Sequence, residues 1–322
     1  MHTDAKLSDM KKISLVLPVM NEASNLLLMH AALKENVLST QNEYEVIFVC
    51  DPSSDNSEGI LREIAKSDSC VKLLFMAERA GQTEAIRAGY RFASGDAVIC
   101  LDADFQDPPE LIPDLIQEWE KGSLIVHTRR SSRKADYLIH RLATNFGYRC
   151  LGWLTNGKVM HNVGDYRLID GRILPLILSF DDPQPFWRGI CSLPGIRNSV
   201  VTYKRPARKS GSTKYGRVIG SPSVAVRGLV SLTNKPLNLL QGASSALAIL
   251  SFMLGITVFL LEYNKDLSPG TVYLLAPLLG VFFALHFAAI AIISAYVAMI
   301  GDQTKRRPNY VLQPEISDDS SV

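Results

Sequence analysis

The sequence predicts an α/β protein: a mostly parallel sheet with helices on both faces, followed by two membrane-spanning helices. Two observations lead to this prediction. Short apolar runs alternate with amphipathic segments over about the first two hundred residues, and two long stretches near the end contain no charged residue. The apolar runs are continuous rather than alternating, which is typical of strands that are covered on both faces.

The expected elements follow one another in strand–helix order. Apolar, β-rich runs predict strands at 13–19, 45–51, 71–76, 97–102 and 124–128. Amphipathic patterns predict helices at 22–37, 56–67, 83–93 and 108–121. Ligands of open parallel sheets bind at the carboxyl ends of the strands. The polar residues that directly follow each strand are therefore the first candidates for a functional site.

Two uncharged stretches, 239–261 and 272–300, each exceed the roughly 20 apolar residues that a helix needs to cross a membrane. Buried helices of a soluble protein are the alternative. Lys and Arg residues flank the pair on both sides, whereas the link 262–270 contains one Lys beside two acidic residues. By the positive-inside rule, we expect a protein of the cytoplasmic (inner or plasma) membrane with both termini in the cytoplasm.

The formal net charge of the 322 residues is only +2, but nine Lys or Arg and no Asp or Glu lie between Arg197 and Lys235. Such a basic block indicates an anionic partner: a phosphate, a nucleic acid or a lipid surface. The five cysteines are widely spaced without a C-x-x-C pair, so neither a zinc site nor a disulfide framework is expected. No Walker A or G-x-G-x-x-G motif follows the first strand, which disfavours a nucleoside triphosphatase or a Rossmann dehydrogenase.

The strongest local signal is the segment 102–110, D-A-D-F-Q-D-P-P-E. A strand that ends at Asp102 can place the carboxylates of Asp102 and Asp104 on one face, where they repel each other unless a cation lies between them. Such hard oxygen ligands suit Mg²⁺ or Mn²⁺, and the ion usually takes further ligands from substrate phosphates. Turns and helix caps are the alternative use of such residues, and we interpret Asp107, before Pro108, as a cap.

A series of motifs resembles one known family. They are L-P-V-x-N-E (17–22), Asp51 followed by S-S-D (53–55), A-G-Q-T-E-A-I-R-A-G (80–89), D-A-D-F-Q-D-P-P-E-L-I (102–112), G-D-Y-R-L (164–168), F-W-R-G-I (186–190) and R-x-x-R-x-S-G-S-T-K-Y (205–215). Over about residues 12–300 the sequence resembles the family-2, GT-A-fold polyprenyl-phosphate glycosyltransferases. That group includes dolichol-phosphate mannose synthases and bacterial undecaprenyl-phosphate glucosyltransferases. The resemblance implies a GT-A (Rossmann-like) sheet and a C-terminal two-helix transmembrane hairpin.

The resemblance also implies roles for individual residues. Pro18, Asn21, Glu22 and Asp51 match the pocket that holds the nucleoside of the donor. Asp102, Asp104 and Gln106 match the metal and diphosphate site, and Ser53 and Ala103 are further residues expected to bind the donor. The catalytic and acceptor-side residues correspond to Arg129, Asp165 and Arg167. The segment that closes over the donor corresponds to Arg205, Arg208, Ser212 and Lys214.

The implied activity is inverting transfer of a hexose from a nucleotide-diphosphate sugar to a polyprenyl phosphate, such as undecaprenyl phosphate, at the cytoplasmic membrane face. A UDP-sugar is favoured and GDP-mannose is possible. A divalent metal ion, the membrane and a homo-oligomer are the expected partners, and nucleic acid is not. The alternative is a catalytically silent protein that binds nucleotide sugars. One departure from the family pattern, Cys50-Asp51-Pro52-Ser53 in place of D-D-G-S, leaves the base and sugar preference open.

These expectations divide the chain into five parts. They are a polar arm (1–12), a catalytic domain (13–210), basic juxtamembrane or interfacial helices (211–238), two transmembrane helices (239–301) and a polar cytoplasmic tail (302–322). The residues after Gln303 are polar, and we expect them to be disordered.

Overall fold

The computed structural model describes residues 10–40, 42–131, 163–180, 185–192, 195–206, 235–263, 269–304 and 310–313. The chain divides into two compact units. One comprises residues 1–149, 158–220 and 307–322, and the other comprises residues 150–157 and 221–306. Residues 1–9 of the expected arm and 211–234 of the expected juxtamembrane part lie outside the described residues.

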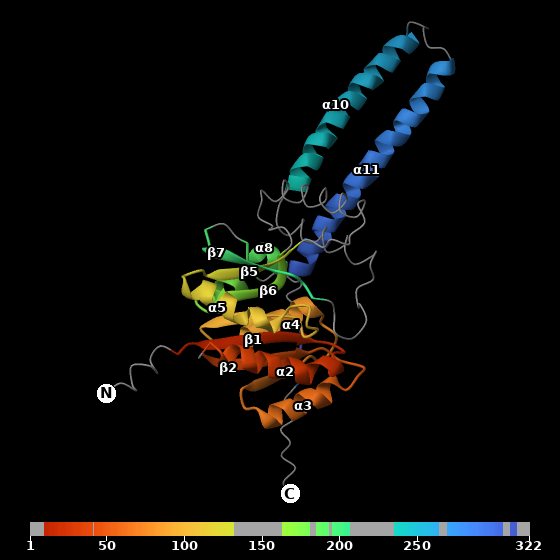
Figure 1. Ribbon diagram of the computed structural model, residues 1–322. Helices are drawn as coiled ribbons and strands as arrows, with labels where there is room; N and C mark the ends of the chain where they lie inside the picture. Colours follow the sequence, from red (N-terminus) through yellow and green to blue (C-terminus); the bar gives the residue numbers. More distant parts are fainter. Residues whose placement is uncertain are drawn as a thin grey trace. The chain divides into compact units, whose positions relative to one another are not determined.

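In the described part of the first unit, seven strands form one sheet (Figure 1). The strands are β1 (Lys12–Val19), β2 (Glu43–Cys50), β3 (Val71–Phe75), β4 (Ala97–Cys100), β5 (Ile125–Arg130), β6 (Val163–Asp170) and β7 (Asn198–Tyr203). Their order across the sheet is β3-β2-β1-β4-β6-β5-β7. β6 runs antiparallel to β4 and β5, and the other neighbouring strands are parallel. The prediction of a mostly parallel sheet is confirmed.

The apolar pattern predicts the first five strands but neither β6 nor β7. β6 carries Asp165, Arg167 and Asp170 within eight residues, and these charges interrupt the continuous apolar run that marks the other strands. Its antiparallel register pairs Arg167 with Cys100, the last residue of β4. The start of β6 therefore lies beside the carboxyl end of β4.

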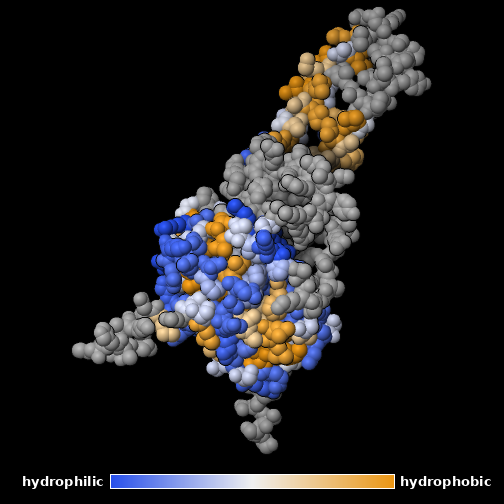
Figure 2. Space-filling model, viewed as in Figure 1, coloured by the Kyte–Doolittle hydropathy of each residue, from blue (hydrophilic) through white to orange (hydrophobic). Residues whose placement is uncertain are grey.

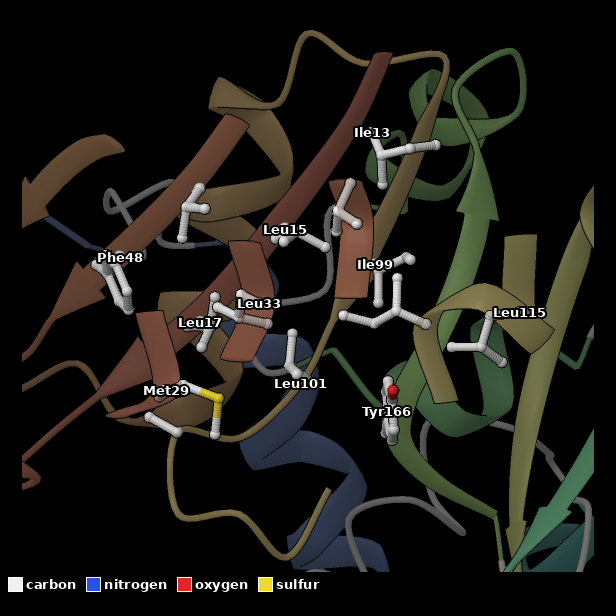
Figure 3. Close-up of a cluster of buried hydrophobic side chains, with 14 of the residues drawn as sticks. Ile13, Leu15, Leu17, Met29, Leu33, Phe48, Ile99, Leu101, Leu115 and Tyr166 are labelled. Atoms are coloured by element: carbon white, nitrogen blue, oxygen red, sulfur yellow. The ribbon is translucent and has the colours of Figure 1, made fainter. Parts of the chain in front are cut away.

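Helices cover both faces of the sheet, as predicted. α2 (Ala23–Leu38), α3 (Ser57–Ser67) and α5 (Ile112–Glu120) pack on one face, and α4 (Gln82–Phe92), α7 (Leu174–Leu178) and α8 (Trp187–Ile190) pack on the other. A short 3-10 helix, η1 (Pro109–Leu111), precedes α5. Strand alternation explains the two cores: Leu15 and Leu17 of β1 join the first apolar cluster, shown in Figure 3, whereas Val16 joins the second.

Glu45 of β2 is a buried charge with a full set of partners. It is 2% exposed and accepts hydrogen bonds from Ser14 Oγ at 2.5 Å and from the Ser94 amide at 2.7 Å. Lys72 Nζ and Lys12 Nζ lie 2.7 and 3.0 Å from Glu45 Oε2. Burial alone would raise the pKa of Glu45, but the bonds from Lys72 and Ser14 lead the interactions that lower it to about 2.

Glu45→Gln is expected to lower the free energy of unfolding at neutral pH by about 1–3 kcal/mol, because two lysines lose their anion. The folded pKa lies below the ordinary value of 4.5, so the carboxylate stabilises the fold above pH 4.5 and ceases to do so as the pH falls toward 2. The deficit of the variant should shrink over that window. Unfolding measured at several pH values checks this, with the exposed Glu43→Gln as matched control. Equal stability of both variants at neutral pH contradicts the prediction.

The second unit contains two long helices, α10 (Lys235–Tyr263) and α11 (Pro269–Thr304). By length and composition, each contains a stretch that can cross a membrane: Leu237–Val258 with mean hydropathy 1.7 and Gly280–Ala298 with 2.2. Of these stretches 0% and 6% is buried, and apolar side chains dominate their described surface (Figure 2). Core helices of a soluble domain would be buried, so this exposure favours lipid or another chain as their surroundings.

Residues 310–313 pair with the end of β3. Leu312 forms an antiparallel bridge with Met76, the Ala77 amide donates to Val311 O, and the Gln313 amide donates to Phe75 O, both at 2.8 Å. The prediction of a disordered tail is therefore wrong for these four residues. Their short apolar run lies within a polar segment, and only the sheet edge that receives it makes it ordered.

Candidate active site

A cavity of about 410 Å³ opens at the carboxyl ends of β1, β2 and β4. This is the place that the parallel-sheet rule predicts. Nine of the expected site residues line it: Pro18, Glu22, Asp51, Asp102, Ala103, Asp104, Gln106, Asp165 and Arg205. Four others, Asn21, Ser53, Arg129 and Arg167, are not among its lining residues. The remaining three, Arg208, Ser212 and Lys214, lie outside the described residues.

Asn21 and Ser53 connect the loops that follow β1 and β2. The Asn21 amide donates to Ser53 Oγ at 3.0 Å, and Asn21 Oδ1 accepts from the Ser54 amide at 2.6 Å. Asn21 has a φ of 53°, a left-handed conformation that Asn adopts more readily than most residues. These bonds hold the rim of the cavity beside Glu22.

Asp51 holds the loop between β3 and α4, residues 77–81. Its carboxylate accepts hydrogen bonds from the amides of Ala80 at 3.2 Å and Gly81 at 2.9 Å. Gly81 has a φ of 85°, which glycine adopts without strain. The loop brings Arg79 and Gly81 to the cavity, and α4 then begins at Gln82, which also lines it.

The chain turns sharply at Phe105 after β4. Phe105 has a φ of 61°, which is rare for a bulky side chain and is typical of functional sites. It packs into the first apolar cluster, while Asp104 and Gln106 on either side line the cavity. Asp104 Oδ1 accepts from the Gln106 amide at 3.0 Å, and Gln82 Nε2 donates to Asp102 Oδ1 at 2.7 Å. The strained turn thus presents two polar side chains and anchors the intervening ring in the core.

Carboxylates crowd this end of the cavity. Burial, followed by the neighbouring carboxylates of Asp107 and Asp104, raises the pKa of Asp102 well above its usual value. A divalent cation at Asp102 and Asp104 would relieve this repulsion. Within the described ranges, no three His, Cys, Asp or Glu side chains are grouped to hold a metal ion. The two carboxylates of Asp102 and Asp104 would leave the other ligand positions of such an ion to water and a bound phosphate, which is common for Mg²⁺.

Asp107 does not cap the following helix, so that prediction is wrong. η1 begins after Pro108 without a side-chain cap, and Asp107 instead accepts from Tyr203 Oη at 2.9 Å and from the Asp102 amide at 3.3 Å. Asp107 thereby connects the segment after β4 with β7. Only the sheet order, which the sequence pattern does not show, brings Tyr203 to this carboxylate.

Asp165 forms ion pairs with two arginines. Arg167 Nη2 lies 2.8 Å from Asp165 Oδ1, and Arg188 Nη2 lies 3.1 Å from Asp165 Oδ2. Burial alone would raise the pKa of Asp165, but Arg188 and Arg167 hold it below the usual value. Arg167 is fully buried and also donates to Trp187 O at 2.7 Å and Gly164 O at 2.8 Å. Both oxygens of Asp165 are thus engaged, and Arg188 reaches the cavity beside it.

β5 ends with two arginines in different environments. Arg129 is exposed, whereas Arg130 lines the cavity, because successive strand residues point to opposite faces. Arg130 Nη2 lies 3.7 Å from Asp107 Oδ1, and Arg130 Nε donates to Tyr203 Oη at 3.3 Å. Arg205, beyond β7, supplies a further cation, and its Nε has no hydrogen-bond acceptor among the described residues.

Four residues with polar or charged side chains line the cavity but were not expected from the sequence: Arg79, Gln82, Arg130 and Arg188. Gln82 and Arg188 lie inside motifs that carry the family resemblance, so the motifs already contained a signal for them. Arg130 was missed because two consecutive arginines in the sequence do not show which of the two side chains points into the cavity. Four arginines surround the carboxylates that line this cavity. This combination suits an anionic ligand that binds together with a cation.

The sheet, the paired carboxylates after β4 and the surrounding arginines are together suited to a glycosyltransferase. The chain belongs to glycosyl transferase family 2, and the sequence model of that family matches residues 14–174.

Relatives match almost the whole chain. An uncharacterized glycosyltransferase, YkcC of Bacillus subtilis, is 31% identical over 303 residues, which is 93% of either chain. The bactoprenol glucosyl transferase of Shigella phage SfV is 31% identical, over 94% of this chain and 99% of its own. A prophage bactoprenol glucosyl transferase homolog of Escherichia coli is 30% identical, over 94% and 98%.

Solved structures with a similar arrangement include glucosyl-3-phosphoglycerate synthase from Mycobacterium tuberculosis, in complex with Mn²⁺, uridine-diphosphate and phosphoglyceric acid. The similarity covers 71% of this chain and 79% of that chain, with 17% sequence identity and a TM-score of 0.48.

Proposed function

We propose that this glycosyltransferase moves a hexose from a nucleotide-diphosphate sugar to a polyprenyl phosphate at the cytoplasmic face of a membrane. A glucosyl donor is favoured, since two relatives that match nearly the whole chain are named bactoprenol glucosyl transferases or homologs of them. The single observation that supports it best is the cavity, which combines paired carboxylates after β4 with four arginines from four other segments. Both substrates carry phosphate, and this charge pattern suits them.

In this proposal the donor nucleoside lies between the loops after β1 and β2. Pro18, Glu22 and Asp51 face it, while Asn21 and Ser53 hold these loops together. The diphosphate lies near Asp102, Ala103, Asp104 and Gln106, with Arg205 as its cation. Arg208, Ser212 and Lys214 stay predicted members of the segment that closes over the donor.

Asp102, Asp104 and Gln106 would hold Mg²⁺ or Mn²⁺. When bound, such an ion neutralises the charge that develops on a diphosphate leaving group. The arginines around the cavity supply part of the same stabilisation through fixed positive charges.

The acceptor phosphate is an anion at neutral pH and needs orientation more than deprotonation. We propose that Arg130 and Arg188 bind it and that Asp165 positions Arg188 together with the buried Arg167. Attack by the phosphate oxygen on the anomeric carbon breaks the bond to the diphosphate in the same step. This in-line displacement inverts the configuration at that carbon and requires no covalent intermediate on the protein.

A lipid acceptor explains the apolar helices α10 and α11, because a protein anchored in the bilayer meets an acceptor in the same membrane at a high local concentration. Lys and Arg flank the helix pair, which supports cytoplasmic ends. The described residues 195–206 and 310–313 lie on either side of the helix pair in the chain and belong to the same compact unit, which supports an even number of crossings between them. A homo-oligomer stays a prediction, to which the exposed apolar side chains of both helices are suited.

A transfer assay on the full-length protein in detergent tests the proposal. Undecaprenyl phosphate is incubated with each of several UDP- and GDP-sugars, in Mg²⁺, in Mn²⁺ or in EDTA. The expected result is one glycolipid from one donor, reduced at least about tenfold by EDTA. Nucleotide binding without product from any donor would instead support a catalytically silent nucleotide-sugar-binding protein.

A further inference from the structure

We propose that the C-terminal segment 310–313 is a positioning element of the donor site, because it holds one end of loop 77–81 in place. This inference rests on the proposed function, which assigns the loop to the donor. The segment follows α11 in the chain, far in sequence from every residue that lines the cavity. Its contribution is to hold backbone, without touching the nucleotide.

The segment 310–313 attaches to the chain where β3 ends and loop 77–81 begins. Its polar contacts fall on three consecutive residues, 75–77, where β3 ends and the loop begins. The Gln313 amide donates to Phe75 O at 2.8 Å, Gln313 Nε2 donates to Met76 O at 3.3 Å, and the Ala77 amide donates to Val311 O at 2.8 Å. The segment thus binds the first residue of the loop itself.

Loop 77–81 has a second anchor at its other end. There the Asp51 carboxylate accepts from the amides of Ala80 and Gly81. Between the two anchors, Glu78 and Arg79 are exposed, as is Ala77 at the first anchor. The conformation of so short a segment depends on its ends, and releasing one end increases the number of conformations that the loop must give up when a ligand binds.

The segment 310–313 is itself held in place by side-chain packing. Tyr310 and Leu312 pack against the second apolar cluster, which includes Met76 and residues of α4. Arg91 of α4 lies over the Tyr310 ring at 5.9 Å from its centroid. Val311 between them is 49% exposed, as strand alternation requires. The segment is therefore anchored by side chains on one face and by backbone bonds to β3.

A second purpose for the same contacts is protection of the sheet edge. β3 is an edge strand, and a pairing segment prevents its free amides and carbonyls from pairing with another chain. Edge protection alone predicts altered stability or aggregation with unchanged donor affinity. Positioning predicts a specific change in donor affinity, and this difference defines the test.

The test compares full-length protein with a form that ends at residue 309 and with Leu312→Ala and Gln313→Ala, using Val311→Ala as matched control. Shortening the chain leaves both apolar helices intact, and the point variants keep the test decisive if the shortened form does not fold. We expect the shortened form to raise the KM for the sugar donor about fivefold, which is about 1 kcal/mol and comparable to one typical hydrogen bond. The KM for the lipid acceptor and kcat should stay within about twofold, and Val311→Ala should behave as wild type.

Hydrogen exchange provides a readout that does not need activity. Amides of residues 77–82 should exchange faster in the shortened form and in Leu312→Ala than in Val311→Ala. An unchanged donor KM, or unchanged exchange at these amides with only a lower Tm, overturns the positioning role and leaves edge protection. If the wild-type protein transfers no sugar, the proposed function fails, while exchange at residues 77–82 still decides this inference.

Discussion

Asp104→Asn is expected to reduce glycosyl transfer at least about a thousandfold while the protein stays folded. The substitution keeps the shape and the acceptor for the Gln106 amide but removes one of two negative charges that would hold a divalent ion. Losing charge stabilisation at a leaving group typically costs two to three orders of magnitude, and losing the ion as well costs more. Transfer rates measured over a range of Mg²⁺ and Mn²⁺ concentrations check this.

The matched control is Asp114→Asn, which neutralises an exposed carboxylate in the first turn of α5. It should leave transfer within about twofold of wild type, because it has the same change in net charge and lies outside the cavity. Metal-dependent nucleotide binding should be lost in Asp104→Asn alone, and the Tm of both variants should stay near that of wild type. Transfer by Asp104→Asn at a tenth of the wild-type rate or more would contradict the metal assignment.

Arg130→Ala is expected to reduce kcat/KM about a hundredfold, whereas Arg129→Ala is expected to change it by less than about threefold. The two residues are neighbours in β5 with the same chemistry, and only Arg130 lines the cavity. The alanine variant of Arg130 removes a cation from the proposed phosphate-binding site, which should cost far more than loss of an exposed charge. The pair therefore separates position from charge.

Arg130→Lys belongs beside these variants, because Lys keeps the charge but loses the planar group that contacts Tyr203. An intermediate loss is expected from it. Initial transfer rates are measured with the acceptor concentration varied at saturating donor. Most of the loss should appear as a lower kcat/KM for the acceptor. Equal losses in the Arg129 and Arg130 variants would remove Arg130 from its proposed role.

Much of the fold follows from local patterns. The first five strands and the helices between them lie within a few residues of the predicted ranges, because each strand is a continuous apolar run between polar turns. Two long helices near the end are present, and each contains the predicted uncharged stretch. β6 and β7 were missed, since charged residues within β6 conceal its apolar face and its pairing partners are distant in sequence.

Only the site residues that belong to short sequence motifs could be predicted. Asp102 and Asp104 follow a recognisable strand, and the structure brings them into the cavity. Arg129 and Arg130 could not be told apart, because which of two consecutive side chains faces inward depends on the register of β5 against β6 and β7. The partner of Asp107 was likewise hidden, because Tyr203 lies 96 residues away in the chain.

The fold class, the apolar helices, the family and the acidic pair after β4 can be predicted from the amino-acid sequence. These depend on periodicity, composition and short motifs, which act over a few residues. Strand pairing is needed to show which arginine enters the cavity, that Asp165 forms ion pairs with two arginines, and that residues 310–313 pair with β3. Each of these depends on strand pairing between distant segments, and pairing energy is gained only after folding has brought those segments together.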